Sequence, residues 1–167
     1  MLKKMLIIIF IISIIISNKK ASITSNNNIN IKNSDIIGEI IIPKINIDKP
    51  LFRVQSPENN IEKNITILKE SIFPDKDNSI MLLAAHSGTG EIAYFNELDK
   101  LTIEDEIILI INKTRYIYKV NNIWEEKKNG YININKSNNK KLILTTCSPT
   151  NNNYQLIIEC IEKDVST

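Results

Sequence analysis

The stretch KLILTTCSPTNNNYQLIIEC, residues 141–160, has two apolar segments separated by a polar loop. The first segment ends at Cys147, and the second begins at Tyr154 and contains Cys160. Short apolar runs rich in β-branched residues and bounded by Pro and Asn clusters are typical of strands. The pattern therefore predicts two neighbouring strands, with Cys147 where the first strand ends and Cys160 within the second.

Other short strand-like segments precede this stretch. They are IIGEIIIPKINIDKPLF (36–52), SIMLLAA (79–85), EIILIIN (106–112) and RYIYKVNNIW (115–124). In the last of these, Tyr116 and Tyr118 alternate with Arg115, so we expect the tyrosines to pack inward and Arg115 to face solvent. Residues 91–101 carry apolar side chains at helical spacing and predict one short helix.

Many short strands without alternating long helices predict a mainly β fold. We expect a closed or nearly closed, mostly antiparallel β-barrel of about eight strands with one or two short helices. The sequence contains no internal repeat.

The N-terminus begins with Lys3 and Lys4, followed by an uncharged apolar run from residue 5 to residue 16. The run fits the core of a cleaved signal peptide, but no small-residue cleavage pattern follows it. We therefore expect residues 1–20 to be an uncleaved membrane anchor, 21–35 a polar tether, and 36–163 a domain outside the cytoplasm. The polar C-terminus predicts no second anchor.

His86 and Cys147 are the candidates for chemistry. The single histidine of the chain, His86, follows an apolar strand and precedes Gly88 and Gly90, and Cys147 likewise ends a strand. Thiolate is the reactive form of cysteine, and a nearby imidazole favours it at neutral pH. A lone histidine is more often structural, and two cysteines outside the cytoplasm often form a disulfide, so a Cys147–Cys160 bridge is an alternative.

The segments LLAAHSG and ILTTC together resemble those of bacterial sortases, which are membrane-anchored cysteine transpeptidases. The family pattern has a histidine at a strand end and a later Thr-Leu-x-Thr-Cys strand. His86, Leu144, Thr146 and Cys147 match this pattern, and Ile143 departs from its first threonine. The resemblance extends over about residues 36–162 and is greatest to class D, with class B next; the polar C-terminus argues against the pilus-polymerising class.

The resemblance implies an acyl transfer. Cys147 would attack the threonine carbonyl of an LPxTG-like sorting signal on a surface protein and form a thioacyl intermediate. His86 would protonate the leaving amine and help to deprotonate the incoming one. The acceptor would be an amine of a peptidoglycan precursor, so the surface protein would become anchored to the cell wall.

Gln155 occupies the position of the arginine that the family carries on its next strand. A glutamine amide has two N–H donors but no charge, so it would be a weaker partner for an oxyanion than a guanidinium. We expect Gln155 to donate to the substrate carbonyl or the oxyanion; the alternative is a polar residue facing water. The other arginines, Arg53 and Arg115, lie in other segments.

Two further classes of function have little support. Without the lysines of the first twenty residues, 17 basic residues face 19 acidic ones, and no basic cluster indicates nucleic-acid binding. One histidine and two separated cysteines do not predict a zinc site, and we expect no cofactor. The acids at 91 and 104–106 could line a calcium site, but a solvated surface explains them better. A sortase-like protein that binds peptides or cell-wall components with weak or no catalysis remains the alternative to an active enzyme.

Overall fold

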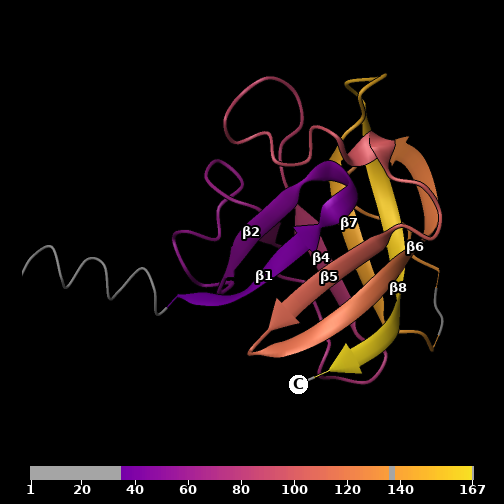
Figure 1. Cartoon of the computed structure of the whole chain (residues 1–167). Coiled ribbons are helices and arrows are strands. Elements are labelled where there is room, and N and C mark those ends of the chain that lie inside the picture. The colour runs from indigo at the N-terminus through magenta and orange to yellow at the C-terminus, as the bar shows by residue number, and fades with distance from the viewer. Residues whose placement is uncertain (1–34, 136–137, 167) are drawn as a thin grey trace, which may run out of the picture. The chain divides into compact units, whose positions relative to one another are not determined.

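The computed structural model describes residues 35–135 and 138–166 (Figure 1). The predicted anchor and almost all of the predicted tether lie outside these residues. The described elements are β1 (Ile36–Ile42), η1 (Pro43–Ile45), β2 (Ile47–Phe52), β3 (Thr66–Ile67), β4 (Ile80–Ala84), η2 (Leu98–Lys100), β5 (Glu106–Ile111), β6 (Thr114–Lys127), β7 (Lys141–Cys147) and β8 (Tyr154–Ser166), where η marks a 3₁₀ helix. Within the described part of the chain, no helix is long and apolar enough to cross a membrane.

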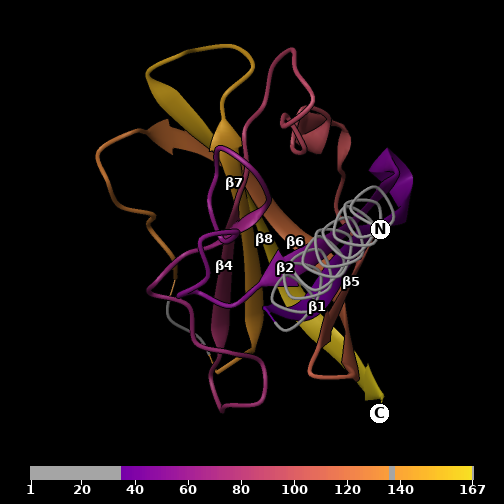
Figure 2. The same cartoon turned by 90° about the vertical axis from the view of Figure 1, so that its left-hand side faces the viewer.

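The strands form one eight-stranded sheet in the order β2-β1-β5-β6-β8-β7-β4-β3. Every neighbouring pair is antiparallel except β4 and β7, which run parallel. The sheet curls around a single large apolar core into a nearly closed barrel (Figure 2). The predicted mainly β barrel of about eight strands is therefore confirmed.

Alternation along the strands fills the barrel. On β6, Tyr116, Tyr118 and Val120 are buried, whereas Arg115 between the turn and the first tyrosine is partly exposed, as predicted. The hairpin between β5 and β6 turns at Asn112 and Lys113, both with positive φ (50° and 72°). Two successive residues with positive φ are typical of the tight turns that match the twist of a β-hairpin.

The short helix predicted within residues 91–101 is limited to η2, because the rest of this segment is a series of turns. Its backbone bonds span three residues, as from Ala93 N to Gly90 O, and Phe95 N donates instead to His86 O. Phe95 and Leu98 are buried in the core all the same. The helical spacing of the apolar residues thus reflects successive turns that each place one side chain inward.

The outer face of β4, β7 and β8 carries a second, smaller apolar cluster. Leu82, Ile143 and Ile157, one from each strand, form this cluster, and Ile132 and Ile134 of the β6–β7 loop pack against it. Alternation fixes which residues share this outer face, because side chains two positions apart along a strand point the same way. The catalytic candidates lie at one end of this face.

Candidate active site

The parallel pairing of β4 with β7 brings His86 and Cys147 together. Ala84 is the register partner of Thr145, and two more residues along both chains lead to His86 and Cys147. Both have the outward parity of Leu82 and Ile143, so the two side chains emerge on the same face. Two residues distant in sequence therefore lie at the ends of adjacent strands.

Hydrogen bonds hold the two segments together beyond the end of β4. Ala85 N donates to Thr145 O at 3.3 Å, and Thr146 Oγ1 donates to Ala85 O at 2.8 Å. Ser87 Oγ then donates to the carbonyl oxygen of Cys147 at 3.1 Å. The buried Thr146 hydroxyl thus links the cysteine strand to the histidine strand, which gives a physical reason for a threonine directly before the cysteine.

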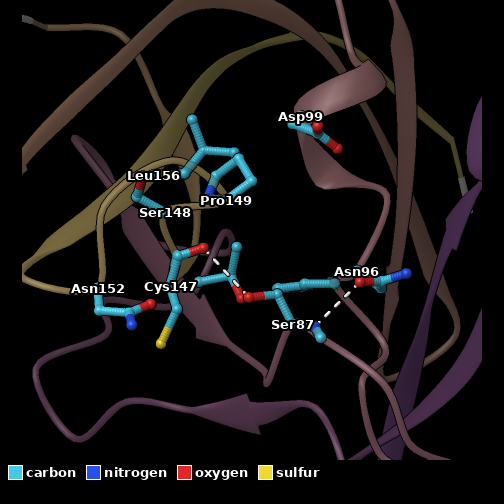
Figure 3. A pocket seen from close by; sticks show the side chains of 11 residues that line it. Ser87, Asn96, Asp99, Cys147, Ser148, Pro149, Asn152 and Leu156 are labelled. Atoms are coloured by element: carbon cyan, nitrogen blue, oxygen red, sulfur yellow. Dashed lines mark hydrogen bonds between the residues drawn. The ribbon is translucent and has the colours of Figure 1, made fainter.

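A cavity of about 450 Å³ opens beside Cys147. Figure 3 shows Cys147 in its wall, with Asn152 on one side and Ser87 on the other. The cavity lies between the loop after β4 and the loop after β7, and its lining residues are Ser87, Gly88, Phe95, Asn96, Asp99, Thr146, Cys147, Ser148, Pro149, Asn152 and Leu156. The Cys147 side chain is exposed, so a substrate can reach its sulfur.

The loop after His86 turns at Gly88, whose φ of 112° favours glycine. Gly88 N donates to Asn96 Oδ1 at 2.9 Å, which fixes the turn against the following segment (Figure 3). The imidazole itself is bound from another loop, with His86 Nε2 3.1 Å from Glu62 Oε1. Glu62 is 69% exposed, so water weakens this contact.

Cys160 lies apart from the site. Both cysteines are free thiols, and Cys160 is fully buried in the barrel core opposite Leu142 of β7. Cys147 is five residues farther along β7, roughly 16 Å at about 3.3 Å per residue, and disulfides need Cα atoms within about 7 Å. The structure therefore excludes the Cys147–Cys160 disulfide alternative. Burial raises the pKa of the Cys160 thiol, with Glu159 adding to the effect, so Cys160 stays protonated.

Gln155 is the register partner of Cys147 on β8. Residues directly opposite in an antiparallel pair share a face, with Cβ atoms roughly 4.5–5.5 Å apart. The Gln155 amide nitrogen donates to Tyr131 O at 2.9 Å and to Glu126 Oε1 at 3.3 Å. Gln155 thus lies next to the candidate nucleophile, and its amide N–H donors bind β6 and the β6–β7 loop.

Lys128, directly after β6, contacts the sulfur. Its Nζ donates to Cys147 Sγ at 3.1 Å and to Asn152 O at 2.9 Å. Lys128 N also donates to Asn153 O at 2.9 Å, so both main chain and side chain are attached to the β7–β8 loop. A cation therefore lies against the candidate nucleophile.

The β7–β8 loop has its own internal support at Ser148. The Ser148 hydroxyl donates to Glu125 Oε1 at 2.8 Å and accepts from the backbone N–H groups of Thr150 and Asn151. Such serine turns compensate for missing backbone partners in a tight loop. These bonds thus fix the conformation of the polar SPTNNN loop, so that Asn152 and Asn153 lie where Lys128 reaches them.

Comparison with known proteins identifies the family. The model of the sortase domain family matches residues 40–162. The chain belongs to the sortase family. The catalytic candidates His86 and Cys147 lie within the matched range, at the end of the barrel where the cavity opens.

Curated relatives agree with this assignment. Sortase A of Bacillus anthracis is 25% identical over 126 residues, which cover 75% of this chain and 59% of the relative. Sortase D of Bacillus subtilis (strain 168) is 27% identical over 114 residues, which cover 67% of this chain and 54% of the relative. The chain thus spans less than two thirds of the length of either relative.

Solved sortase structures have the same fold. The X-ray structure of Clostridium perfringens sortase C with the C-terminal cell wall sorting motif has a TM-score of 0.66 and 28% identity, over 78% of this chain and 71% of that one. A lid mutant of sortase A from Corynebacterium diphtheriae has a TM-score of 0.68 and 21% identity, over 77% and 70%. These relatives are sortases of types A, C and D, so the class of this sortase stays a prediction.

Sequence reasoning missed Lys128 and Glu62. Lys128 belongs to the charged stretch EEKKNG, which looks like an ordinary solvated strand end. Only the pairing of β6 with β8 brings it to the cysteine loop. The two arginines lie elsewhere, because Arg115 pairs with Ser166 at the opposite end of β8 and Arg53 lines a separate cavity.

Two of the four acids considered for calcium have lysine partners. Asp105 Oδ2 accepts from Lys44 Nζ at 2.7 Å, and Glu104 pairs with Lys119 at 3.3 Å. Over residues 35–135 and 138–166, no three His, Cys, Asp or Glu side chains are grouped so that they could hold a metal ion.

Proposed function

We propose that this sortase is a transpeptidase in which Cys147 is the nucleophile and His86 transfers protons. The observation that carries the proposal is the placement of an exposed thiol and the single imidazole on one face, at the ends of adjacent strands. A cavity opens at the thiol, and hydrogen bonds from Thr146 and Ser87 fix the two segments. Preorganised geometry of this kind is what covalent catalysis needs.

The substrate is a surface protein with an LPxTG-like sorting signal. The Cys147 thiolate bonds to the threonine carbonyl carbon, the peptide bond to the next residue breaks, and His86 gives its proton to the leaving amine. The incoming amine, from a peptidoglycan precursor, then attacks the thioester, passes a proton to His86 and releases Cys147. The cavity beside Cys147 has apolar lining from Phe95, Pro149 and Leu156, which suits the apolar side chains of such a signal.

The reaction takes place outside the cytoplasm. The lysine-flanked apolar run at residues 5–16 supports an N-terminal membrane anchor, and the positive-inside rule puts Lys3 and Lys4 in the cytoplasm. The catalytic barrel then faces the cell wall, where both substrates are present.

A second candidate function is peptide binding with little or no turnover. Gln155 favours it, because the amide carries no charge and its N–H donors bind Glu126 and Tyr131. In the active enzyme, Gln155 would exchange the Tyr131 carbonyl for the substrate carbonyl or the oxyanion.

Incubation with a library of sorting-signal peptides and hydroxylamine, followed by mass spectrometry, tests the proposal. We expect cleavage after threonine, with hydroxamate formed at the new end. His86→Asn should lower turnover about a hundred- to ten-thousandfold, the range for one acid–base group. Peptides that bind to the protein without being cleaved would support the binding function instead. Near-normal turnover in His86→Asn would remove His86 from the mechanism.

A further inference from the structure

We propose that Lys128 is a catalytic residue of this sortase, and that its ammonium supplies the positive charge beside Cys147 that Gln155 cannot carry. The inference rests on the proposed transpeptidase function. It starts from the contact of 3.1 Å between Lys128 Nζ and Cys147 Sγ. The reacting atom of the enzyme is thus the direct hydrogen-bond partner of a cation.

Three contacts place this ammonium. Lys128 N donates to Asn153 O, Lys128 Nζ donates to Asn152 O, and the same Nζ donates to the sulfur. The carbonyl of Asn152 belongs to the loop that begins directly after Cys147, so cation and thiol are fixed to one short segment. A lysine that only solvates a strand end would have no such pair of anchors.

Most of the other charged groups around the thiol have different partners, and Asp99 lies in the cavity wall. His86, at the end of β4, is bound to Glu62. On β6, the Glu125 carboxylate accepts from Ser148, and the Glu126 carboxylate accepts from Gln155 and Asn133. These acids would disfavour a thiolate if they were close and unpaired. The ammonium of Lys128 opposes that effect at the sulfur itself.

The chemistry divides between the two nitrogen side chains. Lys128 stabilises the thiolate before attack, since an adjacent cation favours the charged form of a thiol. When the sulfur bonds to the threonine carbonyl carbon and the leaving amine takes a proton from His86, the sulfur becomes neutral. Lys128 keeps all its protons throughout and retains Asn152 O as a partner. Gln155 is left as the uncharged donor on the neighbouring strand.

The test removes the charge and keeps the hydrogen-bond donors. The rate at which iodoacetamide alkylates Cys147 is measured against pH in the full-length chain, for Lys128→Gln, for Lys128→Arg and for the control Lys127→Met. Lys127 is the adjacent residue, is exposed and has no contact with Cys147 among the described bonds. Its replacement by methionine removes the same charge without removing a contact with the sulfur. Lys128→Met is a second neutral variant in case Lys128→Gln does not fold.

We expect Lys128→Gln to move the alkylation profile to higher pH and to lower the rate at pH 7 about tenfold. Peptide turnover should fall about ten- to a thousandfold. Lys128→Arg should stay close to the unaltered chain in both measurements, and Lys127→Met should change neither. An alkylation profile that is the same in the neutral variants as in the unaltered chain would overturn the role of Lys128.

Different results would contradict the transpeptidase function and the role of Lys128. If the unaltered chain cleaves no peptide but Lys128→Gln still shifts the alkylation profile, the transpeptidase function is wrong and the cation at the thiol stands. If the unaltered chain turns peptides over and the neutral variants do so at the same rate, the transpeptidase stands and Lys128 has no part in it.

Discussion

At position 155 this sortase has an amide where we expect the arginine of the family pattern. The Gln155 amide lies opposite Cys147 and binds Glu126 and the Tyr131 carbonyl. The cation at the sulfur comes instead from Lys128 on a different strand end. Lys128 therefore supplies the positive charge at the site, and Gln155 supplies an uncharged hydrogen-bond donor. Hydrogen bonds that involve an ion are stronger than neutral ones.

For Gln155 we predict that its replacement by alanine lowers peptide turnover about ten- to a thousandfold, the range for one lost oxyanion donor. Gln155→Arg should retain activity, because a guanidinium donates more strongly and Glu126 offers it a carboxylate partner. Turnover is measured from hydroxamate formation at saturating peptide. Unchanged turnover in Gln155→Ala would reject the donor role and leave Gln155 as a residue that holds the β6–β7 loop.

At the scale of elements, the outer face of β7 and β8 is anchored by a buried ion pair far along the strands from Cys147. Lys141 Nζ and Glu159 Oε2 are 2.7 Å apart, with side chains only 4% and 8% exposed. Lys141 also donates to Asn135 O at 2.7 Å, and Asn121 donates to Glu159. The pair therefore joins β7, β8 and the β6–β7 loop that covers the apolar cluster of the outer face.

We predict that Lys141→Met lowers the free energy of unfolding by about 3–5 kcal/mol, because it leaves the Glu159 carboxylate buried without its cation. The double variant Lys141→Met/Glu159→Leu should recover most of the loss, since apolar pairs often replace buried ion pairs at little cost. Denaturant unfolding of the single and double variants measures both. A single variant as stable as the unaltered chain would show that Asn121 and water satisfy Glu159 without Lys141.

The elements that local patterns could predict were those with clear alternation. The β5–β6 hairpin and the inward Tyr116 and Tyr118 follow from a two-residue period, as do the two strands that flank the cysteine loop. Of the helical segment predicted within 91–101 only η2 forms, because apolar spacing does not record which backbone bonds form, and here Phe95 N binds His86 O.

The sequence predicted those site residues that local patterns mark, and missed those that only the pairing of distant segments brings to the site. His86 and Cys147 stand at recognisable strand ends, and the resemblance to sortases drew attention to Gln155. Lys128 and Glu62 become part of the site through pairing between distant segments, and charged residues beside asparagines look the same in sequence whether they solvate a surface or bind a thiol.

At the scale of the whole molecule, the barrel collects residues from distant segments at one of its ends. Glu62 comes from the β2–β3 loop, His86 from the end of β4, Lys128 from the end of β6, Cys147 from the end of β7 and Gln155 from the start of β8. The sheet order β6-β8-β7-β4 makes the last four neighbours. A rigid frame of paired strands is a suitable support for a site that has to be held within fractions of an ångström.

The N-terminal apolar run leads to a prediction for the full-length chain. We expect it to sediment with membranes at its full length and to be extracted only by detergent, with the barrel accessible to protease added outside the cell. Fractionation followed by intact-mass measurement tests this. Recovery of only a shortened, soluble form would contradict the anchor and indicate a cleaved signal peptide.

The most direct test of the central claim, that Cys147 is the nucleophile of a sortase reaction, is the mass of the acylated chain. The chain is mixed with the best library peptide, quenched in acid and examined by intact-mass spectrometry and peptide mapping. We predict an adduct on Cys147 equal to the peptide up to its threonine, discharged by hydroxylamine, absent in Cys147→Ala and present in Cys160→Ala. An adduct on another residue, or its equal loss in both variants with the fold retained, would contradict the account.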